Sequence, residues 1–415
     1  MATDQIEVEW QYAALDTRPV VRWLNEALPA GFTLERAGLK ELDDTYFDTP
    51  GWHLHRAGYT CRVRRKGDAA ELTLKSMAEP EGGMRSRREI TEPLSSAEIL
   101  PAAAPGSCGA IIRAVAGRHP VEPLFRLQTQ REIFHLSDEH GLLAEVAVDE
   151  TAIPVGEDRP IRLSRVEVEV EQHAVGRARP FVSQMVDANR LTTAGPSKFE
   201  SALIATGQVV PALTADLGPT TVAPELTAGE VAYAVLRKQF GAFRANEPGT
   251  RLGEDIEALH NMRVAIRRLR AAMAAFRPVL SLRILRYRDQ LGWAAAALGE
   301  VRDLDVQLER MHEWRGNFPP ERAAALQAVE DVLQQRRQAA RKRMLAVPDS
   351  RRYERICESF ARALREGPPK SFAPGRVPVL SVAPDMVERR YKRVRKLGDA
   401  IKKDSPPDAY HTLRI

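Results

Sequence analysis

The sequence predicts an α+β fold for its N-terminal half and an all-α fold for its C-terminal half. Period-two stretches recur up to about residue 205, and apolar residues follow a helical period from about residue 228. Between them, residues 206–227 contain prolines, glycines and threonines without a sustained period, which is typical of a linker. We therefore expect one domain over residues 1–205 and a second over residues 228–415.

Alternation of apolar and polar residues marks the strands of the first domain. The clearest stretches are "QIEVEWQY", "YTCRVRRK", "AELTLKS", "TQREIFHL", "GLLAEVAVDE" and "SRVEVEVEQ". Turn formers such as "KGDA", "SDEHG" and "VGEDRP" separate them, so the strands should form an antiparallel sheet, hairpin by hairpin. Helices are expected near residues 18–29, 107–118 and 176–189.

Long helices are predicted for the second domain. Their approximate ranges are 228–244, 254–277, 282–314, 320–346, 350–365 and 384–402, with a proline-rich connection at 367–384. Charge also differs between the two parts: residues 1–220 carry a net −8 and residues 221–415 a net +13. This contrast suggests that the second domain faces a polyanion, although solvated basic helices account for the charge equally well.

The bulk composition excludes several classes of protein. No run of about 18 apolar residues predicts a transmembrane helix, and the N-terminus lacks the pattern of a signal peptide. The three cysteines, Cys61, Cys108 and Cys357, have no metal-ligand spacing and do not suggest a disulfide framework. A cytoplasmic protein without a membrane partner is the expectation.

Charges of one sign share strand faces in the first domain, because residues i and i+2 of a strand point the same way. The co-facial carboxylates are Glu7 with Glu9, Glu145 with Asp149, and Glu167 with Glu169 and Glu171; the co-facial cations are Arg62, Arg64 and Lys66. An ordinary wet sheet face would mix signs, so the separation favours a closed barrel with a polar lumen. Carboxylates bind Mg²⁺ or Mn²⁺, and Arg and Lys bind phosphate oxygens. Phosphate chains bridged by metal suit both sets.

The order of these motifs resembles the CYTH family, the triphosphate tunnel metalloenzymes. "EVEWQ" stands at the family's E-x-E-x-K signature, and "YFDTPGWHLHRAGYTCRVRRK" is similar to its D-T-P, L-x-x-x-G and L-R-x-R run. "LTLKS", "VEVEVE" and "GPSKFESAL" follow in the family's order. The resemblance spans about residues 5–203 and implies an eight-stranded antiparallel tunnel. Its members include adenylate cyclases, thiamine triphosphatases and inorganic triphosphatases.

Carried over position by position, the resemblance implies two sets of tunnel residues. The metal-binding set is Glu7, Glu9, Glu145, Asp149, Glu167 and Glu169, with Glu7 and Glu9 also as catalytic candidates; the phosphate-binding set is Arg62, Arg64, Lys75, Arg131 and Lys198. The metal, Mg²⁺ or Mn²⁺, would polarise a phosphoryl oxygen while a carboxylate orients water. This chain has Gln11 where the signature has lysine. A neutral amide brings no charge to a phosphate, so binding without turnover is the alternative.

A basic stripe marks one helix of the second domain, "IEALHNMRVAIRRLRAAMAAF" at residues 256–276. At helical spacing His260, Arg263, Arg267 and Arg270 fall within an arc of about 80 degrees, apart from the apolar face. These cations repel one another and lack i,i+4 carboxylates, so an anionic ligand is favoured over a merely solvated face. Arg302, Asp303 and Asp305 lie near enough in sequence to pair with them or to position them.

This stretch resembles the CHAD family of conserved-histidine α-helical domains, through "LHNMRVAIRRLR" and "LGEVRDLDV". The family pairs two four-helix bundles and implies binding of inorganic polyphosphate. The implied contacts are His260, Arg263, Arg267, Arg268 and Arg270, with the repeated H-x-x-R pattern of His411 and Arg414 at the start of a second half. The chain stops at Ile415, so the resemblance implies that most of this second half is missing.

Together these predictions describe a protein that hydrolyses triphosphate or polyphosphate ends in the tunnel and binds the polymer with its helices. A non-catalytic polyphosphate-binding protein is the rival, and a nucleotidyl cyclase is a third reading. Specific binding of DNA or RNA is not expected, since the sequence has no helix-turn-helix spacing, zinc-finger ligands or aromatic stacking motif. The oligomeric state stays open.

Overall fold

The computed structural model describes residues 3–26, 29–67, 69–77, 83–156, 159–211, 216–318 and 320–414, without the side chains of residues 66, 320–325 and 414. The chain divides into two compact units, residues 1–210 and residues 211–415. Each is described here by itself. The boundaries of the linker at residues 206 and 227 stay a prediction.

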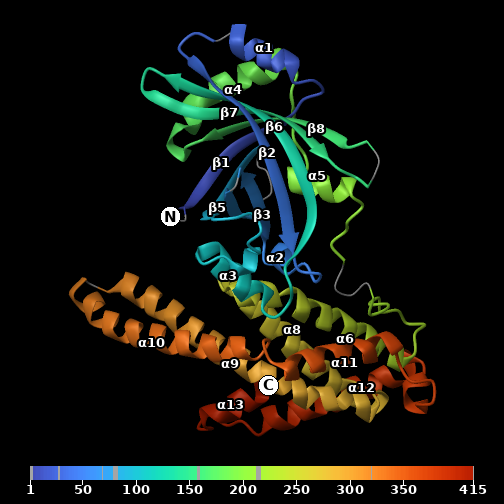
Figure 1. Cartoon of the computed structure of the whole chain (residues 1–415). Coiled ribbons are helices and arrows are strands. Elements are labelled where there is room, and N and C mark those ends of the chain that lie inside the picture. Colours follow the sequence, from blue (N-terminus) through green and yellow to red (C-terminus); the bar gives the residue numbers. More distant parts are fainter. Residues whose placement is uncertain are drawn as a thin grey trace. The chain divides into compact units, whose positions relative to one another are not determined.

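Eight antiparallel strands close into a barrel in the first unit, which confirms the predicted fold class (Figure 1). Around the barrel the order is β1, β5, β4, β3, β2, β6, β7 and β8, and β8 pairs with β1 again. The strands are β1 (Thr3–Ala13), β2 (Thr33–Asp48), β3 (Tyr59–Lys66), β4 (Ala69–Ser76), β5 (Met84–Leu94), β6 (Glu122–Asp138), β7 (Gly141–Ile153) and β8 (Ile161–Val170). A short strand, β9 (Thr192–Thr193), also pairs with β1.

Strand β1 closes the barrel because it pairs along both of its edges. Its register sets Glu7 opposite Arg87 of β5 and Glu9 opposite Glu169 of β8. The alternation predicted for this strand is present: Glu7 and Glu9 line the lumen, while Val8 and Trp10 belong to an apolar core outside it. The polar faces of the strands therefore turn inward, and the apolar faces turn outward.

Helices cover the outward apolar faces of the barrel and so permit a polar lumen (Figure 1). Phe181 of α4 and Leu24 of α1 pack with Trp10 in one core, and Phe199 of α5 packs with Leu127 of β6 in another. Ile112 of α3 is completely buried. The helices of this unit are α1 (Arg18–Glu26), α2 (His53–Arg56), α3 (Ser107–Ala116), α4 (Val175–Asn189) and α5 (Lys198–Ala205), with short 3₁₀ turns at Pro101–Ala103 and Gln172–Ala174.

The second unit is helical, as predicted. Its helices are α6 (Ala228–Ala245), α7 (Glu247–Leu252), α8 (Ile256–Ala275), α9 (Leu282–Asn317), α10 (Pro320–Ala346), α11 (Arg351–Glu366), α12 (Val379–Asp399) and α13 (Pro407–Arg414), with 3₁₀ turns at Arg277–Val279 and Ala373–Arg376. Phe243, Ile266, Val301 and Phe360 bring α6, α8, α9 and α11 into one core. Figure 1 shows α9 and α10 side by side as a long helical hairpin.

Helix α12 begins five residues earlier than the sequence predicts. Pro384 lies inside it, whereas the sequence predicted a proline-rich connection between helices up to residue 384. The start is fixed from outside the helix, since the Val379 amide donates to the Leu226 carbonyl and the Ala228 amide donates to the Val377 carbonyl. Pro384 removes one helical hydrogen bond from α12 but does not end the helix.

A buried ion-pair network joins three helices of the second unit. Glu247 of α7 is 2% exposed and accepts from Arg244 at 2.6 Å, from Arg251 at 3.1 Å and from the Tyr353 hydroxyl at 2.8 Å. Burial opposes ionisation of Glu247, but Arg244 and Arg251 outweigh it and lower the pKa of this carboxyl.

The three cysteines are buried and form no disulfide. Across the described ranges, no helix is long and apolar enough to cross a bilayer.

Candidate functional site

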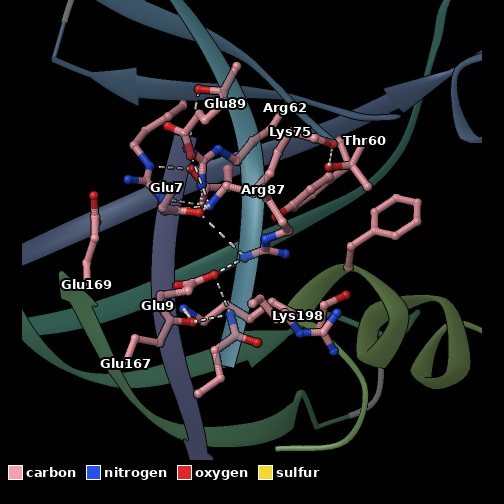
Figure 2. A pocket seen from close by; sticks show the side chains of 18 of the residues that line it. Glu7, Glu9, Thr60, Arg62, Lys75, Arg87, Glu89, Glu167, Glu169 and Lys198 are labelled. Atoms are coloured by element: carbon pink, nitrogen blue, oxygen red, sulfur yellow. Dashed lines mark hydrogen bonds and ion pairs between the residues drawn. The ribbon is translucent and has the colours of Figure 1, made fainter. Parts of the chain in front are cut away.

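The barrel lumen is a cavity of about 440 Å³, lined by side chains from all eight strands and from the start of α5. The described lining contains more carboxylates than cations. The carboxylates are Glu7, Glu9, Asp44, Glu71, Glu89, Glu145, Glu167, Glu169 and Glu200; the cations are Arg62, Arg64, Lys75, Arg85, Arg87, Arg131 and Lys198. Figure 2 shows ten of the lining side chains labelled, with both signs around one space.

Most of the residues predicted for the tunnel line this cavity. Glu7, Glu9, Glu145, Glu167, Glu169, Arg62, Arg64, Lys75, Arg131 and Lys198 are all in its wall. Asp149 is not in this lining; it is completely buried and binds Arg131 and Lys198. Its strand face was predicted, but its place behind two cations depends on contacts between strands that the sequence does not show.

Sequence reasoning missed the contribution of β5. Arg85, Arg87 and Glu89 of this strand line the lumen, and Arg85 and Arg87 are buried. The signal was present, because these residues alternate in "MRSRREI" as the recognised acidic strands do. Asp44 of β2 was missed as well.

The two carboxylates of the opening strand are held by cations from neighbouring strands. The Lys75 ammonium lies 2.8 Å from Glu7 Oε1 and 2.9 Å from Glu89 Oε2. The Arg87 guanidinium pairs with Glu9 and lies 3.6 Å from Glu7 Oε2. Burial disfavours the charged form of Lys75, but Glu7 and Glu89 outweigh it and raise the pKa of the ammonium. Dashed lines in Figure 2 mark this network.

Gln11 bridges two carboxylates instead of carrying a charge. Its amide nitrogen donates to Glu9 Oε1 at 2.9 Å and to Glu167 Oε1 at 3.4 Å, and its side chain is buried. The cation nearest to Glu9 comes from Arg87 of β5. The neutral residue at position 11 therefore links the β1 carboxylates to those of β8.

A second cluster spans the neighbouring strands β6, β7 and β8 and the start of α5. Arg131 makes a bidentate contact with Asp149 at 2.8 and 2.7 Å and reaches Glu167 at 2.6 Å, and Lys198 reaches Glu167 at 2.9 Å. Burial raises the pKa of Glu167, but Lys198 and Arg131 outweigh it, and the net pKa is well below the usual range. Glu167 is therefore ionised at neutral pH.

Arg62 is the least neutralised cation of the predicted phosphate-binding set. Its guanidinium donates to the Thr73 hydroxyl at 3.3 Å and lies 3.8 Å from Asp44, whereas Arg64 holds Asp44 at 2.7 and 2.9 Å. The Arg62 Nε is buried without a hydrogen-bond partner among the described residues. Arg62 therefore has unused donor capacity for an anion in the lumen.

Glu9, Glu169 and Glu145 form an acidic row across β1, β8 and β7, because Glu169 pairs in register with both of the others. Glu169 is exposed to the solvent of the lumen, yet partial desolvation by the barrel wall, and then the charges of Glu7, Glu89 and Glu145, raise its pKa to about 7. In Figure 2 Glu169 stands apart from the dashed network. The carboxylate oxygen atoms of this row are hard metal ligands, the kind that Mg²⁺ and Mn²⁺ prefer.

The described carboxylates of the lumen are of the kind that binds a divalent cation, but in this structure they do not lie close enough together to hold one. No group of three acidic, histidine or cysteine side chains within the described ranges is close enough to hold a metal ion. Glu7, Glu9 and Glu167 instead point to Lys75, Arg87, Arg131 and Lys198. The cations of the lumen thus occupy the carboxylates that a metal would use.

Replacing Glu169 with glutamine should make the metal-free protein more stable at pH 8 but not at pH 4.5. The folded-state pKa is raised, so the unfolded chain releases a proton that the folded chain keeps. The wild type therefore loses stability as the pH rises from about 4.5 to about 7, and the amide does not. Solvent in the lumen screens the effect. We expect a rise in Tm of about 2–4 °C at pH 8, measured by thermal unfolding in a chelator; equal Tm values at pH 8 would contradict this.

The basic stripe of α8 is present in the second unit, and two of its arginines have partners. Arg263 forms an ion pair with Asp303 at 3.0 Å, and Arg270 donates to the Arg288 carbonyl at 3.2 Å. Arg267 and Arg268 are exposed, and His260 is half-buried. Of the other predicted partners, Asp305 pairs with Arg337, and Arg302 lies 3.1 Å from Glu309. His411 is exposed on α13, and the side chain of Arg414 lies outside the described residues.

Comparison with known proteins places these features in two families. Two uncharacterized proteins from strains of Mycobacterium tuberculosis are 27% identical over 418 residues, which span 96% of this chain and 76% of theirs. A putative adenylyl cyclase from Hippeastrum, described as having a dominant triphosphatase activity, is 19% identical over 49% of this chain and 98% of its own, with a TM-score of 0.36.

A putative adenylate cyclase from Bacillus halodurans is 17% identical over 47% of this chain and 95% of its own, with a TM-score of 0.34. The CYTH domain model matches residues 21–193, and the CHAD domain model matches residues 234–415, up to the end of the chain. The chain therefore carries a CYTH domain followed by a CHAD domain.

Proposed function

We propose that the tunnel hydrolyses inorganic triphosphate or the ends of polyphosphate with the help of a divalent metal, and that the helical domain binds the polymer. One observation carries the proposal: carboxylates and cations from eight strands converge on a single lumen that is large enough for a short phosphate chain. Such a mixture suits a ligand that carries both anionic oxygen atoms and bound metal. The match to the CYTH domain supports it.

The residues divide into two working groups. Arg62, Arg64 and Lys75 would hold phosphate oxygens and stabilise the charge that spreads over the transferred phosphoryl group. Glu7 and Glu9, with the acidic row that includes Glu169, would hold Mg²⁺ or Mn²⁺, which supplies Lewis-acid polarisation of a phosphoryl oxygen when it is bound. A carboxylate of this row would orient the attacking water. Arg131 and Lys198 would hold the far end of the chain.

Phosphate release from inorganic triphosphate tests this proposal directly. The full chain is incubated with triphosphate and Mg²⁺ or Mn²⁺, and released phosphate is measured against time. Gln11 favours a second candidate, a tunnel that binds phosphate chains without turnover, because it removes one positive charge from the predicted signature. Salt-sensitive binding of polyphosphate without any phosphate release would support that candidate and contradict ours.

Replacing Arg263 and Arg267 together by glutamine should weaken polyphosphate binding by more than about tenfold, since a hydrogen bond to a charged group is worth about 1.5–3 kcal/mol. Hydrolysis of triphosphate should stay nearly unchanged. Binding is measured by fluorescence anisotropy of labelled polyphosphate at two salt concentrations. The matched control replaces Arg283 and Arg365, which pair with Glu366 and Asp216 on the surface of the same unit. Equal losses in both double variants would show that the α8 stripe is not the binding site.

A further inference from the structure

The carboxylates proposed for metal and the cations proposed for phosphate bind each other in the lumen. Lys75 holds Glu7 at 2.6 Å, and Arg87 holds Glu9 and approaches Glu7 to 3.6 Å. Glu7 and Glu9 are 8% and 3% exposed, and Arg87 is also buried. A divalent cation at these carboxylates would lie beside two positive side chains in a poorly screened space, which is unfavourable.

These cations will not leave by losing their protons. Glu7 and Glu89 raise the pKa of Lys75, and an arginine guanidinium stays protonated in proteins. An anion that takes the cations would make the carboxylates available. Arg87 has a buried Nε without a hydrogen-bond partner among the described residues, so its guanidinium has donor capacity left for such an anion. Phosphate oxygens are strong acceptors for both side chains.

We propose that Lys75 and Arg87 couple the two ligands of the tunnel: a phosphate chain draws them off Glu7 and Glu9, and the freed carboxylates then bind the divalent cation. The inference rests on the proposed function and adds an order of binding to it. Because coupling is reciprocal, bound metal must strengthen phosphate binding by the same factor. Lys75 and Arg87 are therefore positioning residues for the metal as well as phosphate ligands.

Other cations of the chain provide matched controls for this role. Arg62 lines the same lumen but pairs with Asp44 and Thr73, not with Glu7 or Glu9. Its loss tests whether removing any positive charge from the tunnel is enough to attract metal. Arg126 pairs with Asp43 and is not in the described lining of the cavity, so its loss tests the effect of net charge alone.

The experiment measures binding of Mn²⁺ alone to the full, metal-free chain at pH 7.5, from the electron paramagnetic resonance signal of free Mn²⁺. Wild type should bind weakly. Lys75→Met and Arg87→Gln should each bind Mn²⁺ at least tenfold more tightly. Each substitution only removes a positive charge beside Glu7 and Glu9 and adds no metal ligand. Arg126→Gln should stay within about twofold of wild type. Arg62→Gln should tighten Mn²⁺ binding less than either Lys75→Met or Arg87→Gln, and Arg87→Lys should resemble wild type. Near-ultraviolet circular dichroism checks the fold of every variant.

Sulfate, an anion that binds Mn²⁺ poorly in solution, tests the same coupling in the unmodified protein. It should tighten Mn²⁺ binding to wild type, and this gain should disappear in the Lys75→Met, Arg87→Gln double variant. Unchanged or weaker Mn²⁺ binding in the single variants, or equal tightening in Arg62→Gln, overturns the inference. If the variants do not fold, absence of the sulfate effect in wild type overturns it. Failure of the proposed function is a separate result, namely no phosphate release by wild type with triphosphate and Mn²⁺.

Discussion

Replacing Glu7 and Glu9 together by glutamine is expected to lower phosphate release from triphosphate by at least about 100-fold, the size of loss seen when a preorganised electrostatic group is removed from an active site. Glutamine keeps the shape of both side chains but removes the two negative charges that β1 places in the lumen. Arg87 would then lose its carboxylate partners, while Lys75 would keep Glu89. The metal would lose two charged oxygen ligands of the kind that Mg²⁺ and Mn²⁺ prefer. Initial rates at saturating metal give the measurement.

The chain offers a matched control for this loss. Glu171 follows Glu167 and Glu169 with the same spacing, but it is exposed, is not in the described lining of the cavity, and pairs with His173 at 3.2 Å. Glu171→Gln should therefore hydrolyse triphosphate at the wild-type rate. Full activity in the Glu7, Glu9 variant, or an equal loss in Glu171→Gln, would contradict the assignment of the β1 carboxylates.

The local period of the sequence predicted the part of the site that depends on local geometry. Glu7, Glu9, Glu167 and Glu169 share faces because a strand alternates, and a period of two needs no knowledge of the neighbouring strand. The same rule would have found Arg85 and Arg87, which went unrecognised because their strand was not marked as one. The predicted lumen was thus incomplete in both signs. Its cations lacked Arg85 and Arg87, and its carboxylates lacked Asp44, Glu71, Glu89 and Glu200.

Pairing across the barrel could not be predicted in this way. Asp149 shares a strand face with Glu145, yet it is completely buried beneath Arg131 and Lys198, while Glu145 lines the cavity. Strand register and the start of α5 decide this difference, and both involve residues far apart in the sequence. Gln11 is a similar case. The sequence shows a neutral amide where the family signature has lysine, but it does not show that this amide bridges Glu9 and Glu167.

Glu247 is a stronger case of a role that the sequence hides. In "NEPGTRL" it follows a helix and precedes a proline, a setting typical of an exposed first-turn carboxylate. Packing of α11 against α6 and α7 brings Tyr353 onto it, from 106 residues away, and buries both side chains. These contacts form only when the helical unit is folded, so they contribute to its free energy of unfolding.

Replacing Glu247 by alanine should therefore destabilise the helical unit by about 3–5 kcal/mol, because it removes the buried carboxylate that pairs with both Arg244 and Arg251, although Arg251 keeps its pair with Asp349. Calorimetric or urea unfolding of the full chain, followed by circular dichroism at a helical wavelength, gives the measurement. Tyr353→Phe, which removes only one hydrogen bond from the same carboxylate, should cost about 1–2 kcal/mol.

An exposed ion pair in the same unit sets the scale for this prediction. Glu300 pairs with Arg343 on the surface, and Glu300→Ala should cost less than about 1 kcal/mol. A similar cost for Glu247→Ala would show that the network is not stabilising. Triphosphate hydrolysis below the unfolding temperature should be equal in all three variants, because the carboxylates and cations of the lumen belong to the other unit. Loss of hydrolysis in a folded Glu247→Ala variant would instead mean that the helical unit contributes to the reaction.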